Sequence, residues 1–133
     1  LLAALDRQAG EAGRTLRALV QVNVSGERSK SGLAPADAPA VLALANRLRH
    51  VQVVGLMTIP PLAEDPETAR PFFRKLRELR DAWAAETGLE LPELSMGMTH
   101  DLDVAVEEGA TFVRVGTGIF GARARPAPET EET

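Results

Sequence analysis

The stretch "ELSMGMTHDLDVAVEEGATFVRVGTGIFG", Glu93 to Gly121, decides the fold. It opens with an apolar run, continues with a segment of helical pattern that Gly109 ends, and returns to a second apolar run, "TFVRVG". A strand, a helix and a strand in this order predict a parallel βαβ unit with a right-handed crossover. Both predicted strands run straight into residues typical of turns, so each is expected to present backbone groups at its carboxyl end.

The rest of the chain repeats this alternation. Strands are predicted at 17–24 and 51–60, and helices at 1–9, within 33–50 and at 66–87. Side chains suited to capping stand before three of the predicted helices: Asp37, Asp65 and Thr99. Strands alternating with helices, each strand a nearly continuous apolar run, predict an α/β fold with a covered parallel sheet. Both a doubly wound sheet and a piece of a (β/α) barrel fit this order.

Composition excludes several classes of protein. The 133 residues are 44% hydrophobic and 26% charged with a net charge of −4, which indicates one globular domain without general attraction to nucleic acid or to an anionic membrane. The sequence has no cysteine, so it has no disulfide or thiolate metal site, and no His, Asp or Glu spacing suggests a metal. No apolar run has the length of a membrane span, and a cytoplasmic location is expected. The domain is expected to cover 1–124, and the acidic, proline-containing residues 125–133 are expected to be a disordered tail.

Two neighbouring loops indicate an anion site. "SMGMT" follows one strand and "GTG" follows the next, and each combines glycine with a threonine hydroxyl, Thr99 or Thr117. Successive loops of this kind at the carboxyl end of a barrel commonly bind phosphate. The alternative is that the glycines and a capping threonine only turn the chain from strand to helix.

Arg114 is the sharper signal, because it lies between two valines of a buried strand. Strand alternation places its side chain on the same face as Phe112 and Gly116. It would then bring a permanent cation to the phosphate loops, or it would form an ion pair with Asp101 or Asp103, since a buried arginine needs partners.

Four segments resemble, in order, the C-terminal half of the YggS/PROSC family of pyridoxal 5′-phosphate homeostasis proteins: "VQVNVSGERSKSG", "GLMTIP", "FFRKLREL" and "LSMGMTHDLDVAVEEGATFVRVGTGIFGAR". The resemblance runs from about Leu16 to Arg123. It implies the C-terminal four βα units of a (β/α)8 TIM barrel of alanine-racemase type. It also implies intracellular pyridoxal phosphate binding without an established reaction, balancing vitamin B6 and the amino- and keto-acid pools.

The resemblance also implies roles for individual residues. One side of the phosphate cup matches the first loop, at Ser95, Met96, Gly97 and Thr99, and the other side matches Gly116 and Thr117. Arg114 matches the arginine that faces the pyridine nitrogen and keeps it unprotonated, which weakens the cofactor as an electron sink. Asn23 and Met57, at strand ends, are expected to line the pocket. No catalytic residue is expected.

One part of the family's site has no counterpart in this sequence. The lysine that holds the cofactor covalently belongs to an N-terminal half that the chain does not contain, and neither Lys30 nor Lys75 matches it. Four strands leave two open edges where eight would close, so we expect either the missing N-terminal half or self-association to complete the barrel. Two alternatives are a fragment of a pyridoxal-phosphate-dependent amino-acid racemase, which the absence of tyrosine disfavours, and a generic phosphate-binding barrel segment.

Overall fold

Four parallel strands form one sheet in which the spatial order equals the chain order. The computed structural model describes residues 1–28 and 31–124. The strands are β1 (Leu16–Gln21), β2 (Val51–Met57), β3 (Glu93–Met98) and β4 (Phe112–Arg114). The helices are α1 (Leu2–Glu11), α2 (Ala38–Ala45), α3 (Arg70–Thr87), α4 (Leu102–Glu107) and α5 (Thr117–Phe120), with 3₁₀ turns η1 (Pro35–Asp37) and η2 (Pro66–Ala69).

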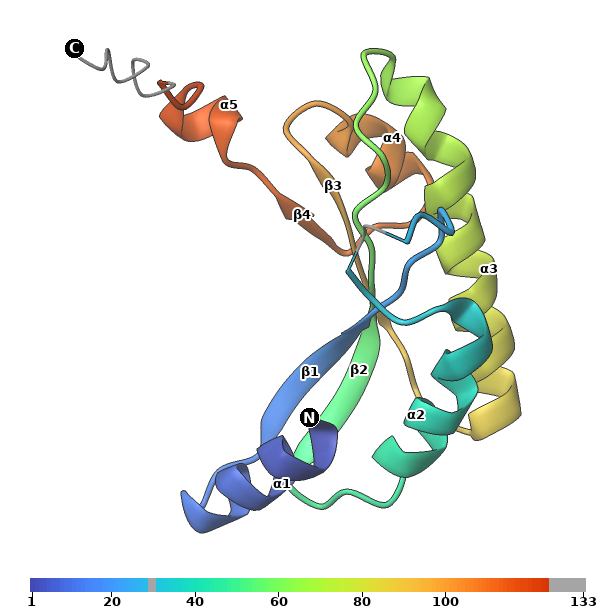
Figure 1. Cartoon of the computed structure of the whole chain (residues 1–133), viewed down its shortest axis with the longest axis vertical. Helices are drawn as coiled ribbons and strands as arrows, with labels where there is room; N and C mark the ends of the chain where they lie inside the picture. The colour runs from blue at the N-terminus through green and yellow to red at the C-terminus, as the bar shows by residue number, and fades with distance from the viewer. Residues whose placement is uncertain (29–30, 125–133) are drawn as a thin grey trace, which may run out of the picture.

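The helices distinguish between the two predicted architectures. Figure 1 shows α2, α3 and α4 on the same side of the sheet, while β4 and α5 extend away from them. A doubly wound sheet carries helices on both faces and reverses its strand order, whereas barrel units add strand after strand with the helices outside. The observed order β1-β2-β3-β4 is therefore that of consecutive barrel units, and β1 and β4 are the two edges.

One hydrophobic core lies between the sheet and the helices. Phe73, Leu76 and Trp83 of α3 pack there with Leu42 of α2 and with Leu94 and Met96 of β3. Phe73, Leu42 and Leu94 are fully buried. The buried residues of α3 form an apolar stripe along the helix, where burial of each large side chain contributes about 1.5–3 kcal/mol.

Several predicted boundaries shift for identifiable reasons. The first helix extends beyond its predicted end at residue 9, and Gly10 within α1 leaves room for His50, since a Cβ there would come 2.8 Å from Cδ2 of His50. Asp37 precedes α2 without a side-chain capping bond, since its backbone is already in a helical turn. Asp65 does cap, with its Oδ1 accepting from the Glu67 amide at 2.9 Å, but it caps η2, and α3 begins only at Arg70.

Three arginines of the long helix α3 bind one buried carboxylate. Glu108, at the end of α4, is 4% exposed. Its Oε1 accepts from Arg70 and Arg74 at 3.1 Å each, and its Oε2 accepts from Arg77 at 2.9 Å. These three arginines all lie on α3, so a single carboxylate joins α3 to α4.

No helix of the described residues is long and apolar enough to cross a membrane. The expected disordered tail at 125–133 and the loop lysine Lys30 lie outside the described residues.

Candidate functional site

Three loops enclose a groove of about 680 Å³ at the carboxyl end of the sheet. The β3–α4 loop contributes residues from Gly97 to Asp101, and the segment after β4 contributes Gly116, Thr117 and residues up to Arg123. The third wall is the proline-containing segment between β2 and η2, with Ile59 and Leu62 among its lining residues. Four of the predicted site residues line this groove: Gly97, Thr99, Gly116 and Thr117. The structure thus brings the two predicted loops together, as parallel neighbouring strands require.

The groove's apolar wall was missed from the sequence. The signal was present in "TIPPLAEDP", a proline-rich run directly after a strand, where it is expected to form an exposed turn at the same edge as the other two loops. Arg123 and Phe120, beyond the second loop, were missed as lining residues too.

Thr99 joins the two loops directly. Its Oγ1 accepts a hydrogen bond of 3.0 Å from the backbone amide of Gly118, in the first turn of α5. The prediction that Thr99 caps the following helix is wrong, because Asp101 occupies the N-cap position of α4. The Oδ1 of Asp101 instead accepts from the Met98 amide at 2.8 Å and closes the β3–α4 turn.

Gly97 requires its glycine for two independent reasons. Its φ of +99° is a conformation that side chains other than glycine rarely adopt, and a Cβ there would lie 2.5 Å from that of Ala105 in α4. The bend that this φ introduces also explains why β4 is shorter than predicted: its pairing with β3 shifts register between Ser95 and Met98. Gly97 therefore allows α4 to pack against the sheet, and it lies within the irregular stretch of the β3–β4 ladder next to the groove.

Arg114 is half-buried and incompletely paired. Its Nη2 donates to the carbonyl oxygen of Thr58 at 3.0 Å, while its Nε is buried without a hydrogen-bond partner. Burial lowers the pKa of the Arg114 guanidinium, and the negative charge of Asp101 acts in the opposite direction. Among the described residues Arg114 forms no ion pair with Asp101 or Asp103, so the alternative interpretation of Arg114, an internal salt bridge, is wrong.

Thr58, which is 1% exposed, positions Arg114 through its carbonyl oxygen and is itself bound to two other segments. Its Oγ1 donates to the Val22 carbonyl at 2.8 Å, and its amide donates to the Ser95 carbonyl at 3.1 Å. The residue after β2 is thereby tied to the chain after β1, to β3 and, through Arg114, to β4. These bonds hold the guanidinium at the carboxyl end of the sheet, although Arg114 is not among the residues that line the groove.

The other predicted site residues lie below or beside the groove rather than in it. Ser95 and Met96 are buried within β3. Asn23 organises its own loop: its Nδ2 donates to the Glu27 carbonyl at 2.7 Å and its Oδ1 accepts from the Gly26 amide at 3.1 Å. Met57 is the half-buried last residue of β2. Their roles in binding stay predictions.

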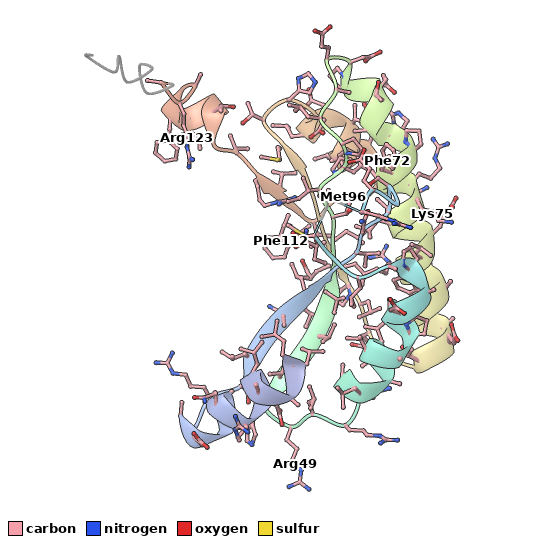
Figure 2. All side chains as sticks on the ribbon, viewed as in Figure 1. Arg49, Phe72, Lys75, Met96, Phe112 and Arg123 are labelled. Atoms are coloured by element: carbon pink, nitrogen blue, oxygen red, sulfur yellow. The ribbon has the colours of Figure 1, made fainter. Side chains whose placement is uncertain are left out.

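Titratable groups near the groove are few. His100 lines it and is exposed, as expected, and Asp101 is the lining carboxylate of the same loop. Over residues 1–28 and 31–124, no three His, Cys, Asp or Glu side chains gather as a metal site would require. Figure 2 places Lys75 on α3, on the side of the molecule away from Phe112 and Arg123, so this lysine does not reach the groove.

The family model described as alanine racemase, N-terminal domain, matches residues 1–124. The chain belongs to this family. Within it, the chain is 54% identical over 105 residues to the pyridoxal phosphate homeostasis protein of Aquifex aeolicus, covering 79% of this chain and 46% of that protein. This confirms the resemblance to the YggS/PROSC proteins. The chain spans about half the length of the curated relatives it matches.

Solved structures agree with the racemase-like fold. PipY from Synechococcus elongatus, solved with PLP bound, is 41% identical and superimposes with a TM-score of 0.81, covering 88% of this chain and 54% of PipY. Alanine racemase from Corynebacterium glutamicum superimposes at 0.62 with 19% identity, covering 77% of this chain and 28% of the racemase, a likeness that concerns the fold alone. The four strands are thus part of an alanine-racemase-type barrel.

Proposed function

We propose that this chain supplies the phosphate and ring-nitrogen side of a pyridoxal phosphate site in a homeostasis protein that binds the cofactor without catalysing a reaction. The observation that carries the proposal is the convergence of two glycine–threonine loops, joined by the Thr99–Gly118 hydrogen bond, with the guanidinium of Arg114 held on the adjoining strand by the Thr58 carbonyl. A guanidinium has five N–H donors, and the Thr58 carbonyl accepts from one nitrogen only. The pyridine nitrogen of the cofactor would be an acceptor for another of these donors.

The residues present fit the two ends of this cofactor. Backbone amides and hydroxyls of the paired loops, chiefly at Thr99, Gly116 and Thr117, would hold the phosphate. Arg114 would orient the ring, because a guanidinium only donates hydrogen bonds and therefore favours an unprotonated nitrogen. Pyridoxal phosphate, when bound, supplies an aldehyde and an electron-accepting ring, and an unprotonated ring accepts electrons less readily. This favours storage and delivery of the cofactor over carbanion chemistry.

The racemase alternative needs a second acid–base group besides the cofactor. Such a group is commonly a tyrosine, and the sequence contains none. A generic sugar-phosphate site would explain the loops but would not require an arginine on the adjoining strand. A titration with several phosphate ligands separates the generic site from the proposal, and an assay of amino-acid racemisation with added pyridoxal phosphate separates the racemase.

We further propose that an N-terminal half-barrel completes the site and supplies the covalent lysine. The relatives are about twice as long as the chain, and eight strands close a barrel of this type. Apolar side chains are exposed at both edges of the sheet, with Leu16 on β1 and Phe112 on β4. Figure 2 shows Phe112 on the side of the sheet opposite α3. A second copy of the chain is the alternative occupant, and light scattering of the purified chain distinguishes the two.

The experiment is a calorimetric titration of the chain with pyridoxal phosphate, pyridoxal, glucose 6-phosphate and inorganic phosphate. Arg114→Met should weaken binding of pyridoxal phosphate by about tenfold or more, since a hydrogen bond to a charged group contributes about 1.5–3 kcal/mol. It should leave inorganic phosphate affinity within about twofold. Arg49→Met is the matched control, because Arg49 lies at the opposite end of the molecule (Figure 2). Tighter binding of glucose 6-phosphate than of pyridoxal phosphate would instead indicate the generic phosphate site.

A further inference from the structure

The short helix α5 carries one wall of the groove but has few contacts of its own. None of its residues is buried, and Ile119 and Phe120 are 69% and 86% exposed. Figure 1 shows α5 at the end of β4, extending away from α2 and α3. Its position relative to the β3–α4 loop therefore depends on contacts at its first turn.

Thr99 makes that contact with both branches of its side chain. Its Oγ1 accepts from the Gly118 amide at 3.0 Å. Its Cγ2 lies 2.8 Å from the point that a Cβ on Gly118 would occupy. The hydroxyl thus binds the amide of Gly118 while the methyl packs over its Cα, and any side chain at Gly118 would collide with Thr99.

The direction of this hydrogen bond leaves the threonine proton free. A hydroxyl has one donor and two acceptor sites. Because Oγ1 accepts from Gly118, its own O–H remains available to donate into the groove that Thr99 lines. A serine at this position would keep the bond and lose the methyl, whereas a valine would keep the shape and lose the bond.

We propose that Thr99 is the positioning residue that fixes α5 against the β3–α4 loop, so that the spacing of the two walls is set before any ligand binds. This inference rests on the proposed function only for its effect on affinity, because the contact itself exists in the free protein. Thr99 and Gly118 act as a matched pair, because the missing side chain of Gly118 makes room for the methyl group of Thr99.

Solvent exchange of the Gly118 amide, measured by NMR on the free chain, tests the contact without any ligand. Thr99→Val should speed this exchange by about three- to tenfold, the loss expected for one neutral hydrogen bond. Thr99→Ser should leave it within about twofold, because the hydroxyl is retained. Thr15→Val, at an exposed threonine before β1 and so at the other end of the sheet, controls for the substitution itself. Equal exchange in the wild type and Thr99→Val would overturn the proposal.

The affinity test uses a double-mutant cycle with pyridoxal phosphate as the probe. Gly118→Ala should weaken binding by about tenfold, because the added methyl collides with Cγ2 of Thr99 and displaces α5. Combining it with Thr99→Ser removes Cγ2 and leaves the longer contacts of 3.1 Å to Cγ1 of Val115 and 3.3 Å to Oγ1, which small shifts relieve, so affinity should return to within about threefold of Thr99→Ser alone. Additive losses would contradict the matched pair. If no variant binds the cofactor, the proposed function fails, while the exchange rates still decide the role of Thr99.

Discussion

Replacing Glu108 with glutamine should loosen the α3–α4 contact that holds the groove's first loop in place. The substitution keeps the shape of the side chain and one acceptor oxygen but turns the other oxygen into an NH₂ donor. Depending on the orientation of the new amide, its NH₂ group faces either Arg77 or the pair Arg70 and Arg74. In each case N–H donors then face one another without an acceptor between them. At least one charge-assisted bond is lost, and the remaining arginines keep their positive charges close together.

The magnitude follows from the burial of the partners. A hydrogen bond to a charged group contributes about 1.5–3 kcal/mol. The side chain of Glu108 is 6% exposed, whereas those of Arg70, Arg74 and Arg77 are 24%, 51% and 34% exposed, so solvent screens part of each interaction. We therefore expect Glu108→Gln to lower the free energy of unfolding by about 2 kcal/mol at pH 7. Urea denaturation followed by Trp83 fluorescence measures this, since Trp83 is buried in the core on α3.

The pH dependence of the stability difference between wild type and Glu108→Gln can refute the ion-pair explanation. The hydrogen bond from Arg74 lowers the pKa of Glu108, burial opposes this, and the bond from Arg70 and the charge of Arg77 lower it further. A lowered pKa means that the carboxylate stabilises the fold above its ordinary pKa of 4.5 and loses this effect as the pH falls through its folded value. The difference between wild type and Glu108→Gln should therefore shrink toward zero in acid. A difference that stays constant from neutral pH down to pH 3, or that is absent at pH 7, would refute the ion-pair explanation. Glu107→Gln is the control, because Glu107 is 62% exposed and bonds only Arg70 among the three arginines.

Three further predictions concern Phe73 in the core, Gly55 in the sheet and Thr58, which binds Arg114. Phe73→Ala should lower the unfolding free energy by about 3–5 kcal/mol, measured by urea denaturation, whereas Phe120→Ala should leave it within about 0.5 kcal/mol because Phe120 is 86% exposed. Gly55→Ala should prevent pairing of β2 with β3, since a Cβ there collides with the backbone carbonyl of Glu93; loss of parallel-sheet circular dichroism checks this. Thr58→Val should cost about 1–3 kcal/mol by orphaning the Val22 carbonyl, and should weaken pyridoxal phosphate binding as Arg114→Met does, because the arginine's anchor shifts.

The elements were predictable because their signals are local. The apolar runs around Val53 and Leu94 and the stripe of α3 are periodic over several residues, and Gly88, at φ 74°, ends α3 as expected of a glycine. The loops after β3 and β4 were expected to lie close together, because neighbouring parallel strands end at the same edge of the sheet. What the residue pattern left open was the choice between a doubly wound sheet and a barrel, which depends on the face each helix covers, a non-local property.

The parts that were wrong depend on partners distant in sequence. Thr99 was assigned to the adjacent helix, but its hydroxyl meets Gly118, 19 positions away. The first helix was predicted to end at residue 9, but it continues through Gly10, where the missing side chain leaves room for His50. An ion pair with Asp101 or Asp103 was one interpretation of Arg114, and the side chain instead donates to the Thr58 carbonyl, 56 positions earlier. Capping preferences and charge rules describe single elements, and these contacts form only once the elements have packed.

The strand order has a consequence for how this part of the barrel acquires its structure. Each strand pairs with the strand next to it in the chain, and no pairing in the described sheet skips a strand. Each pairing closes a loop that contains one helix, as between Leu16 and Val51 or between Gly55 and Glu93, so the sheet can grow by one βα unit at a time. Two of the three loops of the groove flank the β3–α4–β4 unit. A nascent chain therefore acquires the contact between these two loops only when the segment around Gly118 has emerged from the ribosome.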